Sequence, residues 1–137
     1  MKSANETRTA ACAAHAALCN NGFIDLMSGT KPAGANTAIT SQVVLATLTF
    51  GATAYGTPTN GVATANAIGS GTGTAGAGAG TACTWGRAYR SDHTTAVDDK
   101  TAGATGSGME IILASATIST GLTVPCSSCT LTYPDGT

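Results

Sequence analysis

The residues best able to do chemistry in this sequence are its cysteines, because a thiolate can attack a substrate, bind a metal or form a disulfide. The 137-residue chain has five of them, namely Cys12, Cys19, Cys83, Cys126 and Cys129. An odd number cannot pair completely within one chain, so at least one thiol stays unpaired or bonds to another molecule. All five are candidates for buried thiols, structural disulfides or inter-subunit cross-links formed in an oxidising exterior.

Cys126 and Cys129 are separated by two serines, a spacing found in redox motifs and in zinc sites. A redox motif would open a helix after a strand, whereas this pair follows Pro125 and precedes a strand-like run at residues 130–133. Zinc needs two further ligands, and the sequence has no second close pair. The isolated candidates are Cys83, His15 and His93. We predict no metal and no cofactor.

The acidic residues and histidines show no arrangement typical of a hydrolase. Asp92 precedes His93, and a carboxylate could orient that imidazole as a general base. Residues 91–94 also have the composition of a turn between two strands, which we favour. Residues 98–99 could contribute to a calcium site, but their spacing matches no calcium loop, and a turn is the favoured alternative. We predict that the protein is not an enzyme and has no catalytic residues.

Trp85, Arg87 and Tyr89 alternate along one strand-like segment, so their side chains project from one face. Aromatic residues flanking an arginine have the composition of an interface anchor. Packing in the core is the rival interpretation, because the single tryptophan of a small chain is also expected inside. The sequence leaves both interpretations open.

Charge is sparse, with 9% charged residues and a formal net charge of −1. The basic residues are scattered, so no stripe is available for a nucleic-acid backbone. Residues 32–86 contain no Asp, Glu, Lys or Arg. Because interface centres are depleted of charge, we expect contacts with other subunits there. No apolar run reaches the about 18 residues of a membrane span, and residues 1–8 lack a signal-peptide core, which predicts synthesis in a cytoplasm.

Residues 5–19 are predicted to form an alanine-rich helix within a single domain that spans residues 1–137. Ser3 and Glu6 have the spacing of a capping box, and residues 20–22 (NNG) form a stop signal. His15 lies on the same helical stripe as Cys12 and Cys19, and we predict a packing role for it.

The remainder, residues 23–133, is predicted to be an antiparallel β-sandwich or a jelly-roll-like domain, which makes the fold class mainly β. The expected strands are residues 23–27, 42–50, 61–68, 82–91, 94–100, 109–115 and 126–133. Residues 42–50 are apolar on both faces, which predicts a central strand. The glycine-rich residues 69–81 are predicted to be a loop or flexible arm that becomes ordered against a neighbouring subunit.

The order of these motifs resembles small proteins encoded among phage and prophage morphogenesis genes. The resemblance covers nearly the whole chain and is carried by the N-terminal helix and by residues 23–32 (FIDLMSGTKP), 45–50 (LATLTF), 61–68 (GVATANAI) and 81–92 (TACTWGRAYRSD). It implies a structural protein of the virion, placed on the capsid, at the neck or collar, or on the tail, that decorates, links or cements other subunits.

The resemblance also implies the partners, which are copies of this chain and other virion proteins such as major capsid, minor capsid, neck or sheath proteins. Relatives in this family are poor in cysteine, so the cysteine content suggests a cross-linked particle. The alternative function is a receptor- or glycan-binding module on a tail fibre, in which Trp85 and Tyr89 would be exposed stacking platforms.

Overall fold

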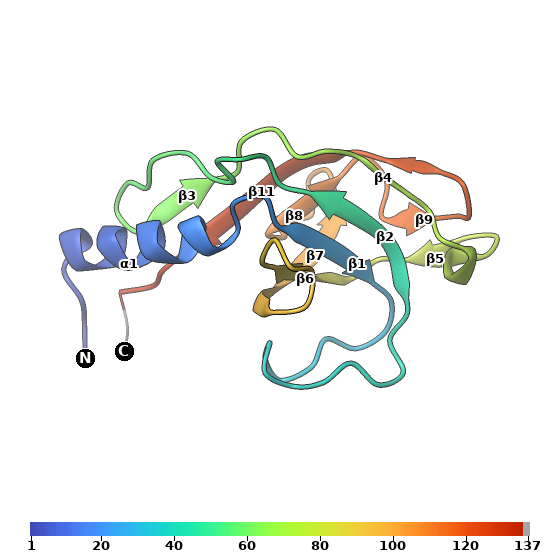
Figure 1. Cartoon of the computed structure of the whole chain (residues 1–137), viewed down its shortest axis with the longest axis horizontal. Helices are drawn as coiled ribbons and strands as arrows, with labels where there is room; N and C mark the ends of the chain where they lie inside the picture. The colour runs from blue at the N-terminus through green and yellow to red at the C-terminus, as the bar shows by residue number, and fades with distance from the viewer. Residues whose placement is uncertain (136–137) are drawn as a thin grey trace.

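The N-terminal helix α1 spans Asn5–Leu18, close to the predicted bounds. Figure 1 shows the computed structural model, which describes residues 1–135. The capping box does not form, because the helix is capped by the backbone of Ala4 and no side chain takes part. The amide of Ser3 instead donates to the carbonyl oxygen of Asp135, 2.8 Å away, which ties the start of the chain to its C-terminal segment.

The rest of the described chain is β-structure, so the predicted mainly β class with one N-terminal helix is confirmed. Seven strands form one sheet in the order β2-β1-β6-β7-β8-β11-β3. Their bounds are β1 Phe23–Met27, β2 Val44–Thr49, β3 Val62–Thr64, β6 Trp85–Tyr89, β7 Ala96–Ala104, β8 Ile111–Leu113 and β11 Cys126–Thr132. All neighbouring pairs are antiparallel except β7 and β8, which are parallel.

Two short ladders and a turn of helix extend the structure beyond this sheet. Strand β4 (Gly71–Thr72) pairs with β10 (Thr123–Val124), and β5 (Thr81–Ala82) pairs with β9 (Thr117–Ile118). A 3₁₀ turn, η1 (Ala75–Ala77), lies between β4 and β5. The β part is therefore one large curved sheet with two small ladders.

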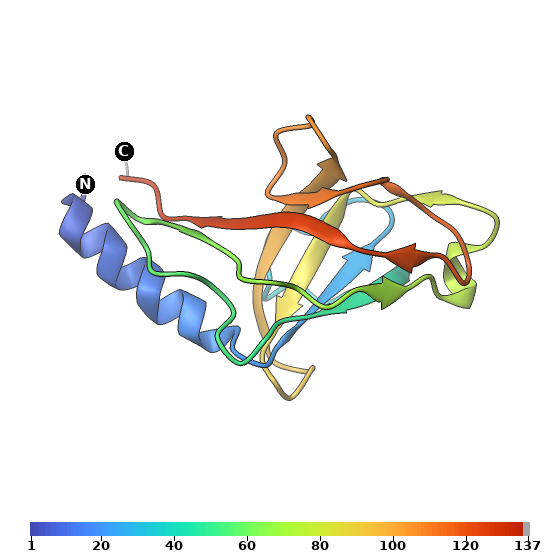
Figure 2. The ribbon, with the colours of Figure 1, turned by 90° about the horizontal axis from the view of Figure 1, so that it is seen from above.

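Strand β2 was expected to be central, yet it is the terminal strand of the hydrogen-bonded series. The chain that leaves β3 returns along its outer edge, where Thr49 and Gly69 exchange backbone hydrogen bonds of 3.2 and 2.8 Å. Further along, the amide of Thr74 donates to the carbonyl of Leu45. Figure 2 shows β4 beside β2. This segment occupies the outer edge of β2, so the strand is not an exposed edge although it ends the hydrogen-bonded series.

The core lies between the curved sheet and the segments that cover it. It is built from aliphatic side chains of the strands, with cysteines and alanines from α1, as the low aromatic content predicts. Fully buried members from the strands are Ile24, Leu26, Leu45, Leu48, Ile111 and Leu113. The helix contacts β3 and β11 and so covers one end of this core.

Residues 69–81 do not form the expected flexible arm, because they pack against the rest of the same chain. The alternating glycines of residues 69–73 serve close approach to other segments. A Cβ atom at Gly71 would overlap the carbonyl oxygen of Thr47, and one at Gly73 would overlap the carbonyl oxygen of Ser119. Glycine at every second position therefore marks an extended segment with one face held against other backbones.

Candidate interaction surface

The five cysteines are thiols that are not paired with one another, and four of them are buried. Cys12 and Cys19 have no exposed surface, and Cys83 and Cys129 have almost none. Burial raises the pKa of Cys19 to about 12 and that of Cys83 to about 11. A bond to a neighbouring subunit needs a sulfur at the surface, and Cys126 is the one cysteine that is partly exposed.

Trp85, Arg87 and Tyr89 lie on one face of β6, as their alternation predicts. Trp85 is only 1% exposed and donates from Nε1 to the carbonyl of Ser28, so this residue belongs to the interior. Arg87 is also buried, which favours core packing over an exposed interface anchor for both residues. Tyr89 is partly exposed. The burial of Trp85 removes one of the two stacking platforms that a glycan-binding module would use.

Arg87 is held by Asp99 of the adjacent strand β7. Its Nε and Nη2 atoms lie 2.7 and 2.9 Å from the two carboxylate oxygens, and the two side chains are 5% and 3% exposed. The hydrogen bonds that Arg87 donates to this carboxylate raise the pKa of Arg87 against the effect of burial. Arg87 also donates to the carbonyl of Gly34, so it fixes the crossing segment between β1 and β2 over this face of the sheet.

Asp92 and His93 form the predicted turn and do not pair with each other. The carboxylate of Asp92 accepts hydrogen bonds from the backbone and hydroxyl of Thr95, which lower its pKa to about 2. His93 takes a positive φ of 54° and turns toward β1, where Nε2 lies 2.9 Å from Oδ1 of Asp25. Its ring stacks on Phe23 at 4.3 Å between centroids.

A second histidine, His15, lies on α1 and joins the helix to β7 and to the segment just after β11. Its Nε2 atom lies 2.6 Å from Oδ2 of Asp98 on β7, and its Nδ1 atom lies 2.8 Å from the hydroxyl of Tyr133, just after β11. Lys100, which is 2% exposed, places Nζ 3.1 Å from the same carboxylate oxygen. The predicted packing role of His15 is thus a polar one, and nothing in the sequence indicated its partner 83 positions away.

The two carboxylates considered for a calcium site serve opposite faces of β7. Asp98 faces the helix side and pairs with His15, whereas Asp99 pairs with Arg87 on the other side. Side chains of successive strand residues alternate between faces, so these oxygens cannot surround one ion. Burial alone would raise the pKa of Asp98, but hydrogen bonds from His15 and the charge of Lys100 lower it.

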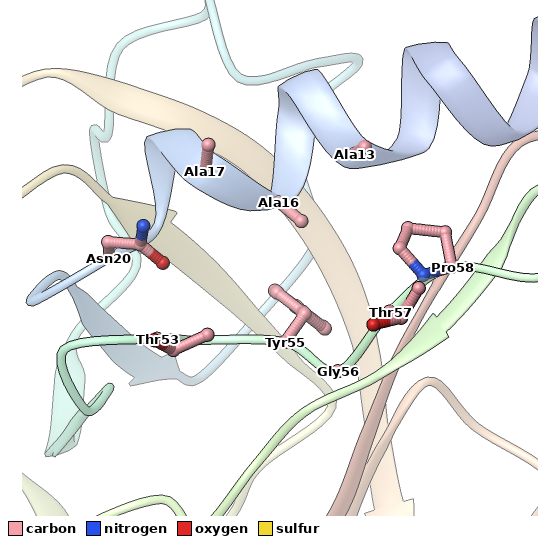
Figure 3. Close-up of a pocket in the computed structure, with 9 residues that line it drawn as sticks. All are labelled: Ala13, Ala16, Ala17, Asn20, Thr53, Tyr55, Gly56, Thr57 and Pro58. Carbon is pink, nitrogen blue, oxygen red and sulfur yellow. The ribbon is translucent and has the colours of Figure 1, made fainter.

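A cavity of about 220 Å³ lies between α1 and the segment of residues 53–58. Figure 3 shows that the helix lines it with alanines and the facing segment with Tyr55 and small residues. The hydroxyl of Tyr55 is 3.4 Å from the sulfur of Cys129, and Asn20 accepts a hydrogen bond from the backbone of Ala54. The lining of this cavity therefore has no acidic or basic side chain that could act on a ligand.

The surface that best matches an interaction role is the end of the molecule opposite the helix. We call residues 69–84 and 115–125 the uncharged lobe, because they contain no Asp, Glu, Lys, Arg or His. The lobe holds β4, η1, β5, β9 and β10 and projects away from α1 (Figures 1 and 2). Leu122, in the exposed loop between β9 and β10 that we call the tip of the lobe, is 39% exposed. Sequence analysis had identified only its first segment, as part of the uncharged residues 32–86.

Comparisons with protein-family models, with curated proteins and with solved structures give no match. In the described part of the chain, no helix is long and apolar enough to cross a membrane. Within residues 1–135, no group of three or more His, Cys, Asp or Glu side chains is arranged to hold a metal ion.

Proposed function

We propose that this chain is a structural protein of a bacteriophage virion that decorates, links or cements capsid or neck and collar subunits. The observation that carries the proposal is the uncharged lobe, a projecting surface without acidic side chains, basic side chains or histidine. Its partners would be copies of this chain and other virion proteins. The resemblance of the sequence to phage morphogenesis proteins agrees with this role.

The composition of the lobe suits a surface that is covered in an assembly. Interface centres are depleted of charge, since a buried unpaired charge costs far more than a buried small or neutral side chain. The exposed positions of the lobe carry small, hydroxyl or aliphatic side chains, including Thr72, Ala82, Thr117 and Leu122. Such a surface can be desolvated on contact at little electrostatic cost.

The lobe is also held in one shape before any partner arrives. The amide of Gly73 donates to the carbonyl of Leu122, and the amide of Gly121 donates back to the carbonyl of Gly73, at 2.8 and 2.9 Å. The amide of Thr120 donates to the carbonyl of Gly78. A surface that is ordered before binding loses less conformational entropy when a partner arrives, so even a small contact area can give a higher affinity.

Contact in this proposal is mainly non-covalent. Four of the five cysteines are buried, so the cross-linking hypothesis narrows to Cys126. The fibre-tip alternative now has weaker support, because Tyr89 is the partly exposed member of its expected stacking pair and Trp85 is buried.

The test is to locate the chain in particles of the phage or prophage that encodes it. Quantitative mass spectrometry should find it in many copies per purified particle, and cryo-electron microscopy should place it at the capsid or neck with the uncharged lobe against a neighbour. Density at a fibre tip would instead support the receptor-binding alternative. Absence from mature particles would contradict both.

A pair of matched variants tests the lobe itself. Leu122→Asp introduces one charge at its exposed tip, and Thr7→Asp introduces the same charge on the exposed first turn of α1. We expect Leu122→Asp to reduce the copy number in particles at least tenfold, whereas Thr7→Asp should assemble like the wild type. Equal incorporation of both variants would show that the lobe is not the contact surface.

A further inference from the structure

Cys126 and Cys129 project from the same face of β11, although residues three apart in a strand normally face opposite sides. Cys126 is opposite Leu113 of β8, and Cys129 is opposite Ile111, with a bulge between Cys126 and Ser128. Leu113 and Ile111 are two residues apart and share one face. The bulge adds one residue to β11, so both cysteines face the same side as these partners.

The register also sets the separation of the two cysteines. Two strand positions correspond to about 6.7 Å along β11, and side chains on one face stand nearly parallel. A disulfide needs Cβ atoms about 3.8 Å apart, so this spacing does not favour one. A metal–thiolate bond is about 2.3 Å long, so one ion can join two sulfurs that lie about 4.6 Å apart. Cβ atoms at this spacing are too far apart for a direct S–S bond, whereas two sulfurs that lean toward each other can come within the about 4.6 Å that one ion spans.

Space is available beside the two sulfurs. Strand β11 pairs with β3 as far as Thr130, and the amide of Ala65 still donates to the carbonyl of Cys129. Beyond that point the chain at residues 66–68 diverges from β11, and a cavity of about 170 Å³ opens between them. Both cysteines line it, together with the serines between them and Asn66.

The two sulfurs have different surroundings: that of Cys129 is buried, and that of Cys126 can be reached from solvent. Burial raises the pKa of Cys129 to about 11, while the charge of Lys100 and the hydroxyl of Tyr55 act in the opposite direction. The hydroxyl of Tyr55, 3.4 Å from the sulfur of Cys129, is placed to donate a hydrogen bond to the thiolate that remains when a metal ion has displaced the proton. Cys126 is partly exposed and directs its thiol to the carbonyl of Ser128, 3.3 Å away, so an ion can enter from its side.

We propose that Cys126 and Cys129 bind one soft monovalent ion of the copper(I) and silver(I) type in two-coordinate geometry. Thiolates select soft ions, whereas tetrahedral zinc requires four ligands. Each thiol releases its proton to solvent as its metal–sulfur bond forms, and no electron is transferred. The resulting site has a net charge of −1, and the nearby ammonium of Lys100 partly balances it. This inference does not depend on the proposed virion role.

Silver(I) is the probe, because it is monovalent, soft and not redox-active under ordinary conditions. The full-length reduced chain is loaded with one equivalent of silver(I) under argon, challenged with a hundredfold excess of a monothiol, and measured by native mass spectrometry. The wild-type chain should retain one ion, because two sulfurs on one chain act as a chelate. Cys126→Ser and Cys129→Ala should each lower retention at least tenfold.

Cys83→Ser is the matched control, because Cys83 is a buried thiol that lies outside this cavity, and it should retain the ion. Circular dichroism of each variant checks that it is folded, and Cys126→Ser is the decisive one because that side chain is partly exposed. The proposal is overturned if the wild-type chain retains no ion, if Cys126→Ser retains it fully, or if the purified chain already has a Cys126–Cys129 disulfide.

Discussion

The helix side of the molecule and the uncharged lobe hold their shape by different means. Outside the lobe, ion pairs join different elements: His15 of α1 meets Asp98 on one face of β7, and Arg87 of β6 meets Asp99 on the opposite face. The lobe has no Asp, Glu, Lys, Arg or His and is held by backbone hydrogen bonds between segments brought close by glycine. Ion pairs therefore stabilise the part of the protein outside the lobe, whereas the projecting lobe carries no charged side chain.

This contrast bears on function because the two constructions respond differently to a partner. A buried ion pair fixes one arrangement of strands, since removing either member leaves an uncompensated charge. A lobe closed by backbone contacts can present any neutral side chain outward without disturbing its own supports. The structural demands of the fold and the demands of the proposed contact surface are thus met by different residues.

The largest loss of stability is expected when the buried ion pair of Arg87 and Asp99 is removed. Arg87→Met would leave the carboxylate of Asp99 buried without its cation and should lower the free energy of unfolding by about 3–5 kcal/mol. Arg90→Met, on an exposed arginine of the same hairpin, should change it by less than about 0.5 kcal/mol. Urea denaturation of both variants measures the difference. Equal stabilities would show that the pair at Arg87 does not support the fold.

The second largest loss of stability is expected when a glycine of the lobe is replaced. Gly73→Ala places a methyl group against the carbonyl of Ser119 and should cost about 1–3 kcal/mol through strain. Gly34→Ala has open space at its Cβ position and should be nearly neutral. Amide hydrogen exchange should show that the loss of protection in Gly73→Ala is concentrated in residues 69–84 and 115–125. A uniform loss over the whole chain would argue against a separately supported lobe.

Acid should weaken the helix side through Asp98. Its folded-state pKa lies below the ordinary value of 3.8, so the stability from its pairing is present above about pH 4 and is lost as pH falls further. Asp98→Asn should therefore be less stable than wild type at pH 7 and show a shallower decline from pH 5 to 2.5. Asp135→Asn, at an exposed carboxylate, should keep the wild-type slope. Denaturant midpoints across this pH range provide the measurement.

The smallest effect on stability is expected at the tip of the lobe. Leu122→Asp alters a 39% exposed side chain and should change the free energy of unfolding by less than about 0.5 kcal/mol. Ile118→Asp, at a fully buried position of the same lobe, should disrupt it by placing an unpaired charge in the core. Thermal melting distinguishes the two. A marked loss in Leu122→Asp would mean that its exposed side chain supports the fold.

Local patterns in the sequence were sufficient to predict the helix and most of the strands. Alanine content and the NNG stop signal predicted α1 to within one residue, and a short β-like run between turn residues predicted β1 at its observed bounds. The turn at Asp92 was also predicted from its composition. Each of these features depends on residues within a few positions of one another, which is the range over which propensity and periodicity act.

Long-range partners were not predictable in the same way. The position of β2 at the end of the sheet, the pairing of His93 with Asp25 and the pairing of His15 with Asp98 all depend on elements that meet only after folding. The glycine-rich residues 69–81 predict a loop or flexible arm, because the sequence of one segment does not indicate which backbone will approach it.

The sequence by itself determined the mainly β class, the N-terminal helix, the absence of a basic stripe and the uncharged character of long segments, because composition and periodicity are properties of the chain. Tertiary structure alone decided which thiols are buried, which aspartate each histidine meets, and that two neutral segments 30 residues apart combine into one projecting lobe. Those outcomes depend on contacts between distant segments, whose positions are set by packing the whole core at once.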